Sequence, residues 1–320
     1  MTSTSRTPRA AALVVVLALG LAACGGGNNS STSGGTDGQG SSGSVRIDGS
    51  STVAPFTEVA AELFMEANGG VTVTVGVSGT GGGFEKFCNG ETDASDASRP
   101  IKDSEIELCE ANDVAYEDVT VALDGLVNVV PADNDFVDCL TVEELNTIWS
   151  PDSTVSSWAE VRDGFPDVAL DLYGAGTDSG TFDYFTDAIN GEEGAIRTDY
   201  NASEDDNITV QGVAGSPGGL GFFGLSYLQE NADTLKGLAV DGGGGCVEAS
   251  VETVQSGEYT PLSRPLFVYA SDTALARPEV VAFFEFIIDN EREIAEAALF
   301  VPLTEEQLEQ AEEQVASLQS

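Results

Sequence analysis

The chain contains no histidine, and only 12 of its 320 residues are lysine or arginine, against 54 aspartates and glutamates. Without an imidazole base, no serine of this chain can act as the nucleophile of a Ser-His-Asp triad. The formal net charge of −42 argues against a nucleic-acid partner, because so acidic a surface cannot replace the counterions around phosphates. We interpret the many acidic side chains as groups that keep the surface solvated. Such a surface is typical of a protein in a salty medium, where dissolved ions screen the repulsion between charges.

The N-terminal segment has the composition of a signal peptide. Arg6 and Arg9 precede an apolar run over residues 11–21, which is short for a membrane span. The following Leu-Ala-Ala-Cys sequence resembles a bacterial lipobox, so we expect removal of residues 1–23 and lipidation of Cys24. The alternative is an ordinary signal peptide with an incidental cysteine.

The mature chain is expected to begin with a tether. Residues 25–44 are almost all small or polar, a composition that forms no core and behaves as a flexible linker. We therefore expect an exported protein that a lipidated Cys24 holds at the outer face of the cell membrane, with no other membrane attachment.

Four further cysteines are present at Cys88, Cys109, Cys139 and Cys246. An even number in an exported chain favours two disulfides, and three pairings are open. We favour Cys88–Cys109 and Cys139–Cys246, which keep each pair within one lobe of the fold expected below; free buried thiols are the alternative. The spacing does not fit a zinc ribbon, and we expect no metal and no cofactor.

Short β-branched runs alternate with helical patterns, which indicates an α/β fold. The strongest strand is expected over residues 71–77, and helices are expected over 55–68, from 84, from 182, over 280–288 and over 304–318. Two long apolar runs, 119–130 and 264–270, are expected to cross between two lobes. Lobe 1 would hold residues 45–123 and 266–320, and lobe 2 residues 124–265.

Three expected strands each end in a turn rich in glycine and hydroxyls, at residues 50–53, 78–81 and 176–181. In open α/β sheets, ligands bind beyond the carboxyl ends of strands, and a helix start offers free N–H groups to an anion. We therefore expect a site for a tetrahedral oxyanion. Its candidate donors are Ser51, Thr52, Val53, Ser78, Thr80, Gly81, Ser179, Gly180 and Thr181.

A fourth segment adds charge to these donors. Ser98 and Arg99 lie in Ala-Ser-Arg-Pro, and Arg99 is one of the few basic residues of the mature chain. Its alternative role is a surface salt bridge. Asp178 could accept a hydrogen bond from a protonated anion, which would favour phosphate over sulfate; its alternative role is a helix cap.

Several segments resemble the phosphate-binding proteins of phosphate-specific ABC importers. They are Asp-Gly-Ser-Ser-Thr-Val at 48–53, Ser-Gly-Thr-Gly-Gly-Gly-Phe at 78–84, Ala-Ser-Arg-Pro-Ile at 97–101, Gly-Thr-Asp-Ser-Gly-Thr-Phe at 176–182, Ser-Pro-Gly-Gly-Leu-Gly-Phe at 216–222 and Pro-Leu-Ser-Arg-Pro-Leu at 261–266. The resemblance implies a two-lobed periplasmic-binding-protein fold of type II, with a mixed sheet in each lobe and two crossover strands as the hinge. It also implies binding of inorganic phosphate and delivery to a membrane permease. We expect a monomer and no enzymatic activity.

The chain departs from the better-known members of that family at two places. Ser98 replaces an aspartate of the third motif, and Ala175 stands where those members carry an arginine. Our hypothesis gives the arginine's role to Arg99 and the acceptor's role to Asp178. Three alternatives stay open: a binding protein for sulfate or molybdate, a Ser-Lys hydrolase and an adhesion lipoprotein.

Overall fold

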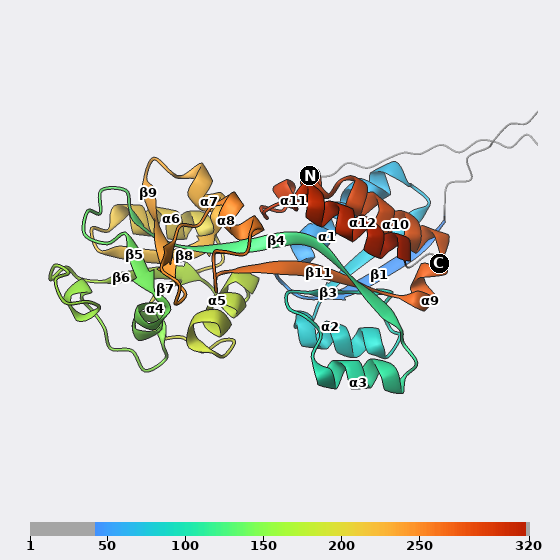
Figure 1. Ribbon diagram of the computed structural model, residues 1–320, viewed down its shortest axis with the longest axis horizontal. Helices are drawn as coiled ribbons and strands as arrows, with labels where there is room; N and C mark the ends of the chain where they lie inside the picture. Colours follow the sequence, from blue (N-terminus) through green and yellow to red (C-terminus); the bar gives the residue numbers. More distant parts are fainter. Residues whose placement is uncertain (1–41, 318–320) are drawn as a thin grey trace, which may run out of the picture. The chain divides into compact units, whose positions relative to one another are not determined.

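The valine-rich segments after residue 42 form the strands of a mixed sheet, drawn in Figure 1. Strand β1 (Gly43–Gly49) pairs in parallel with β2 (Val71–Val77) and β3 (Ala94–Ala97). Strand β11 (Ser263–Ser271) lies antiparallel between β3 and β4 (Tyr116–Pro131). The computed structural model describes residues 42–317. The expected signal peptide, Cys24 and nearly all of the expected tether lie outside the described residues.

Strand β4 belongs to two groups of strands. It pairs with β11 as far as Gly125, and beyond that residue it pairs with β8 (Gly219–Gly224) and β9 (Leu235–Asp241). Strands β6 (Asp171–Ala175) and β7 (Asn201–Ser203) extend the second group beyond β8, while β5 (Cys139–Thr141) and β10 (Cys246–Val247) pair with β9. The expected strand over 119–130 is thus confirmed as part of β4, and Gly125 marks where it changes partners.

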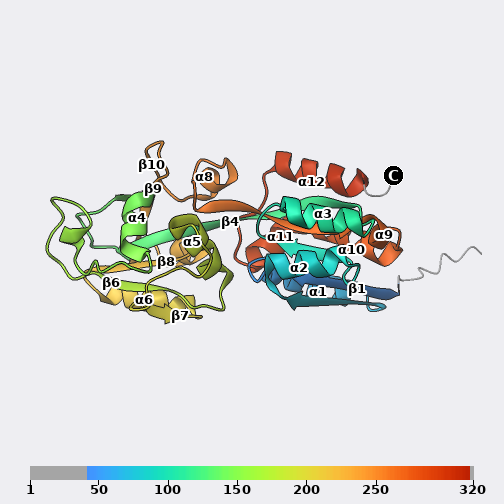
Figure 2. The ribbon, with the colours of Figure 1, turned by 90° about the horizontal axis from the view of Figure 1, so that it is seen from below.

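Helices cover both faces of the first group of strands (Figures 1 and 2). The alternation of side chains along β11 gives each face of the sheet an apolar surface for helices to pack on. Leu266 and Val268 join the main core, while Phe267 and Tyr269 join a smaller core on the opposite face. Helix α1 (Ala54–Ala67) packs with α10 (Pro278–Asp289) and α11 (Glu291–Ala297), and α2 (Gly79–Cys88) packs with α3 (Asp103–Ala111).

The remaining helices are short and lie mainly around the second group of strands. None of the helices over residues 42–317 is long and apolar enough to span a membrane. The remaining elements are α4 (Val142–Trp149), a 3-10 turn (Trp158–Glu160), α5 (Gly180–Asn190), α6 (Asp206–Gly215), α7 (Leu225–Glu230), α8 (Val251–Gln255), α9 (Asp272–Leu275) and α12 (Glu305–Ser317).

Helix α2 begins earlier than the sequence suggested, at Gly79 rather than at Phe84. Its glycines are poor helix formers, but one of them is required by packing. A Cβ on Gly83 would lie 2.5 Å from Gly49 Cα and 2.8 Å from Ser95 Oγ. The missing side chain lets α2 approach the strand ends closely, and this tertiary contact outweighs the low helix propensity.

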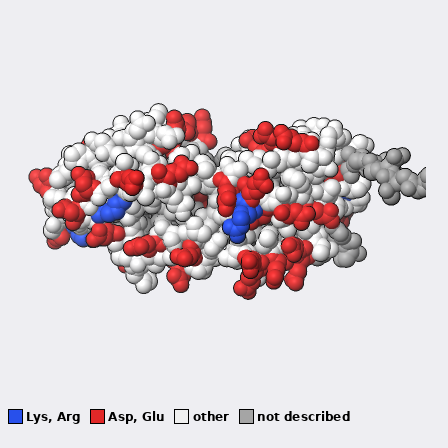
Figure 3. Space-filling view, turned by 90° about the horizontal axis from the view of Figure 1, so that it is seen from above, with Lys and Arg blue, Asp and Glu red and all other residues white. Residues whose placement is uncertain are grey.

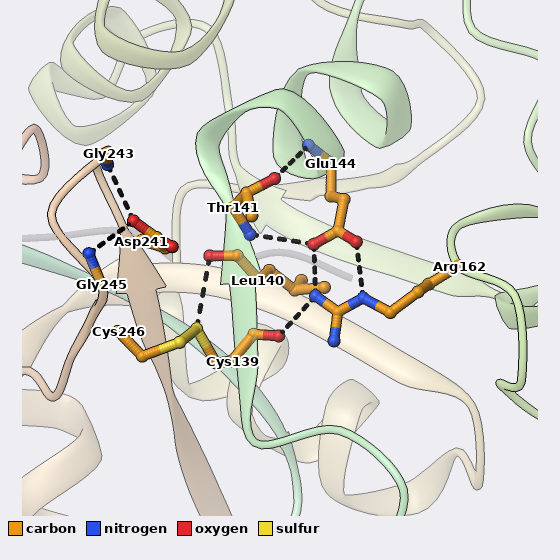
Figure 4. The surroundings of a disulfide bond; sticks show 9 residues. All are labelled: Cys139, Leu140, Thr141, Glu144, Arg162, Asp241, Gly243, Gly245 and Cys246. Carbon is orange, nitrogen blue, oxygen red and sulfur yellow. Dashed lines mark hydrogen bonds and ion pairs between the residues drawn. A yellow bond between two sulfur atoms is a disulfide. The ribbon is translucent and has the colours of Figure 1, made fainter.

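Both favoured disulfide pairings are confirmed, Cys88–Cys109 between α2 and α3 and Cys139–Cys246 between β5 and β10. Figure 4 shows the surroundings of the second disulfide. Arg162 donates to Glu144 and, at 3.0 Å, to the carbonyl of Cys139, while Asp241 accepts the N–H groups of Gly243 and Gly245. The bridge thus ties together two strands that flank β9.

One acid is buried beneath the turn between β1 and α1. Asp96 is fully buried on β3, where Thr57 Oγ1 lies 2.6 Å from its Oδ2. Its Oδ1 has no hydrogen-bond partner among residues 42–317. Burial raises the pKa of Asp96 to about 8, so the folded protein favours a neutral carboxyl at this position.

We predict that Asp96→Asn gains stability relative to the wild type as pH rises. The unfolded carboxyl loses its proton near pH 4, whereas the folded one keeps it until about pH 8. The wild type therefore loses unfolding free energy between these values, and the amide does not. Melting temperatures of both proteins at pH 5 and pH 8.5 check this. An equal difference between the two proteins at both pH values would contradict it.

Candidate functional site

The first hydroxyl turn joins β1 to α1. The N–H of Thr52 donates to Ser50 Oγ, and the N–H of Ala54 to the carbonyl of Ser50. No side chain caps α1, and among the described residues nothing accepts the N–H of Val53. This helix start therefore offers an unsatisfied donor beside the Thr52 hydroxyl, as an anion site requires.

The second turn meets the third segment through side chains. Thr80 Oγ1 lies 3.1 Å from Ser98 Oγ and accepts the N–H of Ser98 at 3.3 Å. Ser78 does not join them: its exposed hydroxyl donates to Asp48, which also pairs with Lys86. Gly81 lies in the first turn of α2. The structure thus brings Thr80 and Ser98 together and directs Ser78 elsewhere.

The turn before α5 lies against the first turn. Ser179 caps α5 by accepting the N–H of Thr181 at 3.2 Å, which leaves its O–H free to donate. A Cβ on Gly180 would lie 2.1 Å from Thr52 Oγ1 and 2.6 Å from Thr52 N. Only glycine permits this approach, so Ser179, Gly180 and Thr181 lie beside Thr52.

Arg264, at the start of β11, connects these turns. Its Nη2 donates to Thr52 Oγ1 at 3.0 Å, and its Nη1 donates to the carbonyl of Ser98 at 3.3 Å. The face of its guanidinium lies over the ring of Tyr184, with Cζ 3.7 Å from the ring centroid. A planar guanidinium holds several donors in one fixed arrangement, and here that arrangement spans three separate segments.

Asp124 is the anionic partner of Arg264. Its Oδ2 accepts from Nε and Nη2 of Arg264, both at 3.3 Å. The side chain is only 7% exposed. Burial raises the pKa of Asp124 above its ordinary value, although Arg264 opposes the rise. The pair places one positive and one negative group at the base of the hydroxyl turns.

Arg99 is held by a different acid. Its Nη1 and Nη2 donate to the two oxygens of Glu105 at 2.9 and 2.8 Å. Burial alone would raise the pKa of Glu105, but the Arg99 guanidinium and the backbone N–H of Lys102 together hold that pKa below its ordinary value. Arg99 does share a hollow of about 180 Å³ with Ser98, Tyr184 and Arg264. Arg99 therefore lies near the turns, but its Nη1 and Nη2 atoms are hydrogen-bonded to Glu105.

A hollow of about 620 Å³ opens above the first and last turns, and Asp124 lines it together with Ser51, Thr52 and residues 178–181. The hollow is acidic. Asp178 is exposed here, and its N–H donates to Glu204. Further acids line the hollow at Glu58, Glu62, Glu204 and Asp206. On the face drawn in Figure 3, acidic side chains cover much more of the surface than basic ones.

Two of these residues were missed by the sequence analysis, Arg264 and Asp124. Arg264 entered only as part of the apolar run 264–270 and of a resembling segment, and Asp124 only as part of the apolar run 119–130. Their signal was a single charge within each of the apolar runs 119–130 and 264–270, a placement that is costly unless the charge is paired. Their pairing across β4 and β11 becomes visible only in the register, where Arg264 lies opposite Asp124.

The arrangement suits an oxyanion that is bound by short-range donors. Hydroxyls, free N–H groups and one guanidinium converge on Thr52. Bonds to a charged group contribute roughly 1.5–3 kcal/mol each, enough in number to offset the dehydration of an anion. Among residues 42–317, no group of three or more acids and cysteines is placed to hold a metal ion.

Comparisons with known proteins agree with this geometry. Residues 30–291 match the family model described as PBP superfamily domain. The protein SphX of Synechocystis sp. is 44% identical over 305 residues, covering 94% of this chain and 87% of that protein. The phosphate-binding protein PstS of Staphylococcus saprophyticus is 39% identical, covering 88% of this chain and 86% of that protein.

A solved structure supports the same assignment. The crystal structure of a possible phosphate binding protein from Planctomyces limnophilus has a TM-score of 0.83 and 45% identity, covering 88% of this chain and all of that one. The expected α/β fold of a periplasmic-type binding protein is thereby confirmed. This chain belongs to the PBP superfamily and, within it, to the PstS-like phosphate-binding proteins.

Proposed function

We propose that this protein binds inorganic phosphate outside the cytoplasmic membrane and delivers it to the permease of an ABC importer. The observation that supports this most strongly is the convergence of separate hydroxyl turns on Arg264. The relatives named phosphate-binding proteins support the ligand. A binding role also fits the absence of histidine, because an anion receptor needs donors and no proton-transferring base.

We propose that phosphate lies between the first turn and the start of α5. Its donors would be Thr52, the N–H of Val53, the O–H of Ser179, the N–H of Gly180 and the hydroxyl of Thr181, since Ser179 accepts the Thr181 N–H here. Ser51, Thr80, Gly81 and Ser98 would complete the shell, together with the guanidinium of Arg264. The sequence also predicts Ser78 and Arg99 as phosphate donors. In this structure Ser78 donates to Asp48 and Arg99 donates to Glu105.

The site would form by closure of two lobes. The boundaries proposed from sequence, 45–123 with 266–320 and 124–265, divide the chain near Gly125, where β4 changes partners. Thr52 and Ser98 then belong to lobe 1, and α5 belongs to lobe 2. Arg264 lies at the boundary, so phosphate would contact both lobes and the segment between them.

We propose the location of the protein from the composition of its N-terminal segment. We propose that Cys24 carries the lipid anchor and that the following polar segment tethers a monomeric receptor to the outer face of the membrane. The tether would allow the binding domain to reach the permease while remaining near it. Sulfate or molybdate is the alternative ligand. A Ser-Lys hydrolase would need Lys86, Lys102 or Lys236, and it is disfavoured at two of these because Lys86 pairs with Asp48 and Lys236 with Asp138.

We predict that Arg264→Gln weakens phosphate binding at least about 100-fold, because it removes a charge-assisted bond to phosphate and also the guanidinium that holds Thr52 and Ser98 in position. Arg99→Ala should cost less than about fivefold, since Glu105 already engages that guanidinium. Calorimetric titration of each purified variant with phosphate measures both effects. A large loss for Arg99→Ala with wild-type affinity for Arg264→Gln would return the role to Arg99, as the sequence hypothesis holds.

We predict that the acceptor for the phosphate proton is a buried carboxylate. A buried charge repels an unprotonated anion more strongly than an exposed one, which water screens. Asp124→Asn should therefore lower the ratio of phosphate to sulfate affinity, and Asp178→Asn, at the exposed rim, should leave it unchanged. Titration of both variants with both anions measures the ratio. A reduced ratio for Asp178→Asn alone would instead support the acceptor predicted from sequence.

A further inference from the structure

Tyr184 belongs to the same helix as the last hydroxyl turn. Helix α5 begins at Gly180, so Tyr184 lies about one turn beyond the proposed phosphate donors Ser179, Gly180 and Thr181. Arg264 lies in β11 at the boundary between the two proposed lobes, and its hydrogen bonds to Thr52 and Ser98 tie its side chain to lobe 1. A rigid helix moves both ends of its first turn together, so any approach of Ser179 toward Thr52 also brings the Tyr184 ring toward Arg264.

The ring and the guanidinium meet face to face. Arg264 Cζ lies 3.7 Å from the ring centroid of Tyr184, well within the range of a cation–π contact. Tyr184 is 8% exposed, so water screens this contact weakly. The guanidinium edges remain directed at Thr52, Ser98 and Asp124. The ring therefore contacts a face of the guanidinium, which makes no hydrogen bonds.

The ring itself is held in place. The Tyr184 hydroxyl donates to the carbonyl of Pro261 at 2.7 Å, three residues before Arg264. Burial raises the pKa of Tyr184, so the phenol stays protonated and able to donate at neutral pH. This bond, to a residue of the same proposed lobe, holds the ring in place where it meets the Arg264 side chain.

We infer that Tyr184 is a positioning residue that latches α5 onto Arg264 when the site is occupied. This inference rests on the proposed function. Phosphate held by Ser179 and Arg264 together would be released only when α5 withdraws, and withdrawal separates the ring from the guanidinium. The contact therefore stabilises the closed, occupied state and slows release, while it makes no bond to phosphate itself.

The test compares Tyr184→Leu with Tyr184→Phe. The mature protein is loaded with radiolabelled phosphate, excess unlabelled phosphate is added, and the label retained on a filter is followed over time. Tyr184→Leu removes the π face and should release phosphate about tenfold faster or more. Tyr184→Phe keeps that face and should stay within about threefold of the wild type. The ratio of phosphate to sulfate affinity should not change in either variant.

Tyr116→Leu is the matched control, because the Tyr116 ring contacts Phe87 and Tyr269 rather than Arg264. It should release phosphate at the wild-type rate. Melting temperatures establish that each variant is folded. Should Tyr184→Leu not fold, Tyr184→Met replaces it, since methionine fills the space without a π face.

Three outcomes would overturn the inference. They are wild-type release from the folded Leu or Met variant, release from Tyr184→Phe as fast as from Tyr184→Leu, and equal acceleration in Tyr116→Leu. A wild-type protein that retains no labelled phosphate would overturn the proposed function, and this inference with it. Failure of the inference alone leaves wild-type binding intact, so the two failures are distinguishable.

Discussion

The interaction on which the site depends is the contact of one guanidinium with four separate parts of the chain. Arg264 donates to Thr52 after β1 and to Ser98 after β3, and it pairs with Asp124 on β4. Its remaining face lies on Tyr184 of α5. A charge this deeply buried is tolerated only with a partner, and Asp124 supplies one. The hydroxyl turns thus gather around a group that is fixed before a ligand arrives.

The acidic surface makes these short-range donors around Arg264 necessary for binding an anion. With 54 acids and 12 bases in the sequence, the protein cannot attract an anion over a distance, and the hollow beside the turns is itself lined with carboxylates. Recognition must then rely on short-range donors, whose hydrogen bonds depend little on ionic strength. Most of the other basic side chains form ion pairs with acids, such as Arg99 with Glu105 and Lys86 with Asp48. These bases therefore do little to attract an anion from a distance.

Much of the fold could be predicted from the sequence, because local patterns determine it. The β-branched run at 71–77 forms β2. Four cysteines in a chain expected to be exported predicted two disulfides, and both favoured pairs are present. The start of α2 could not be predicted, since the close approach of Gly83 to Gly49 depends on packing between distant segments. For the same reason the sequence pointed to hydroxyl turns but not to their common centre. Arg264 and Asp124 are 140 residues apart, and only strand register brings them together.

The central claim is that phosphate is bound by short-range donors around Arg264 within a repulsive surface. Calorimetric titration of the purified mature protein with phosphate and with sulfate, at 0.1 M and 1 M salt, tests it most directly. We expect phosphate to bind with a dissociation constant of about 1 μM or below, far more tightly than sulfate, and with an affinity that does not fall at high salt. An affinity that falls steeply with salt, or equal binding of the two anions, would contradict this account.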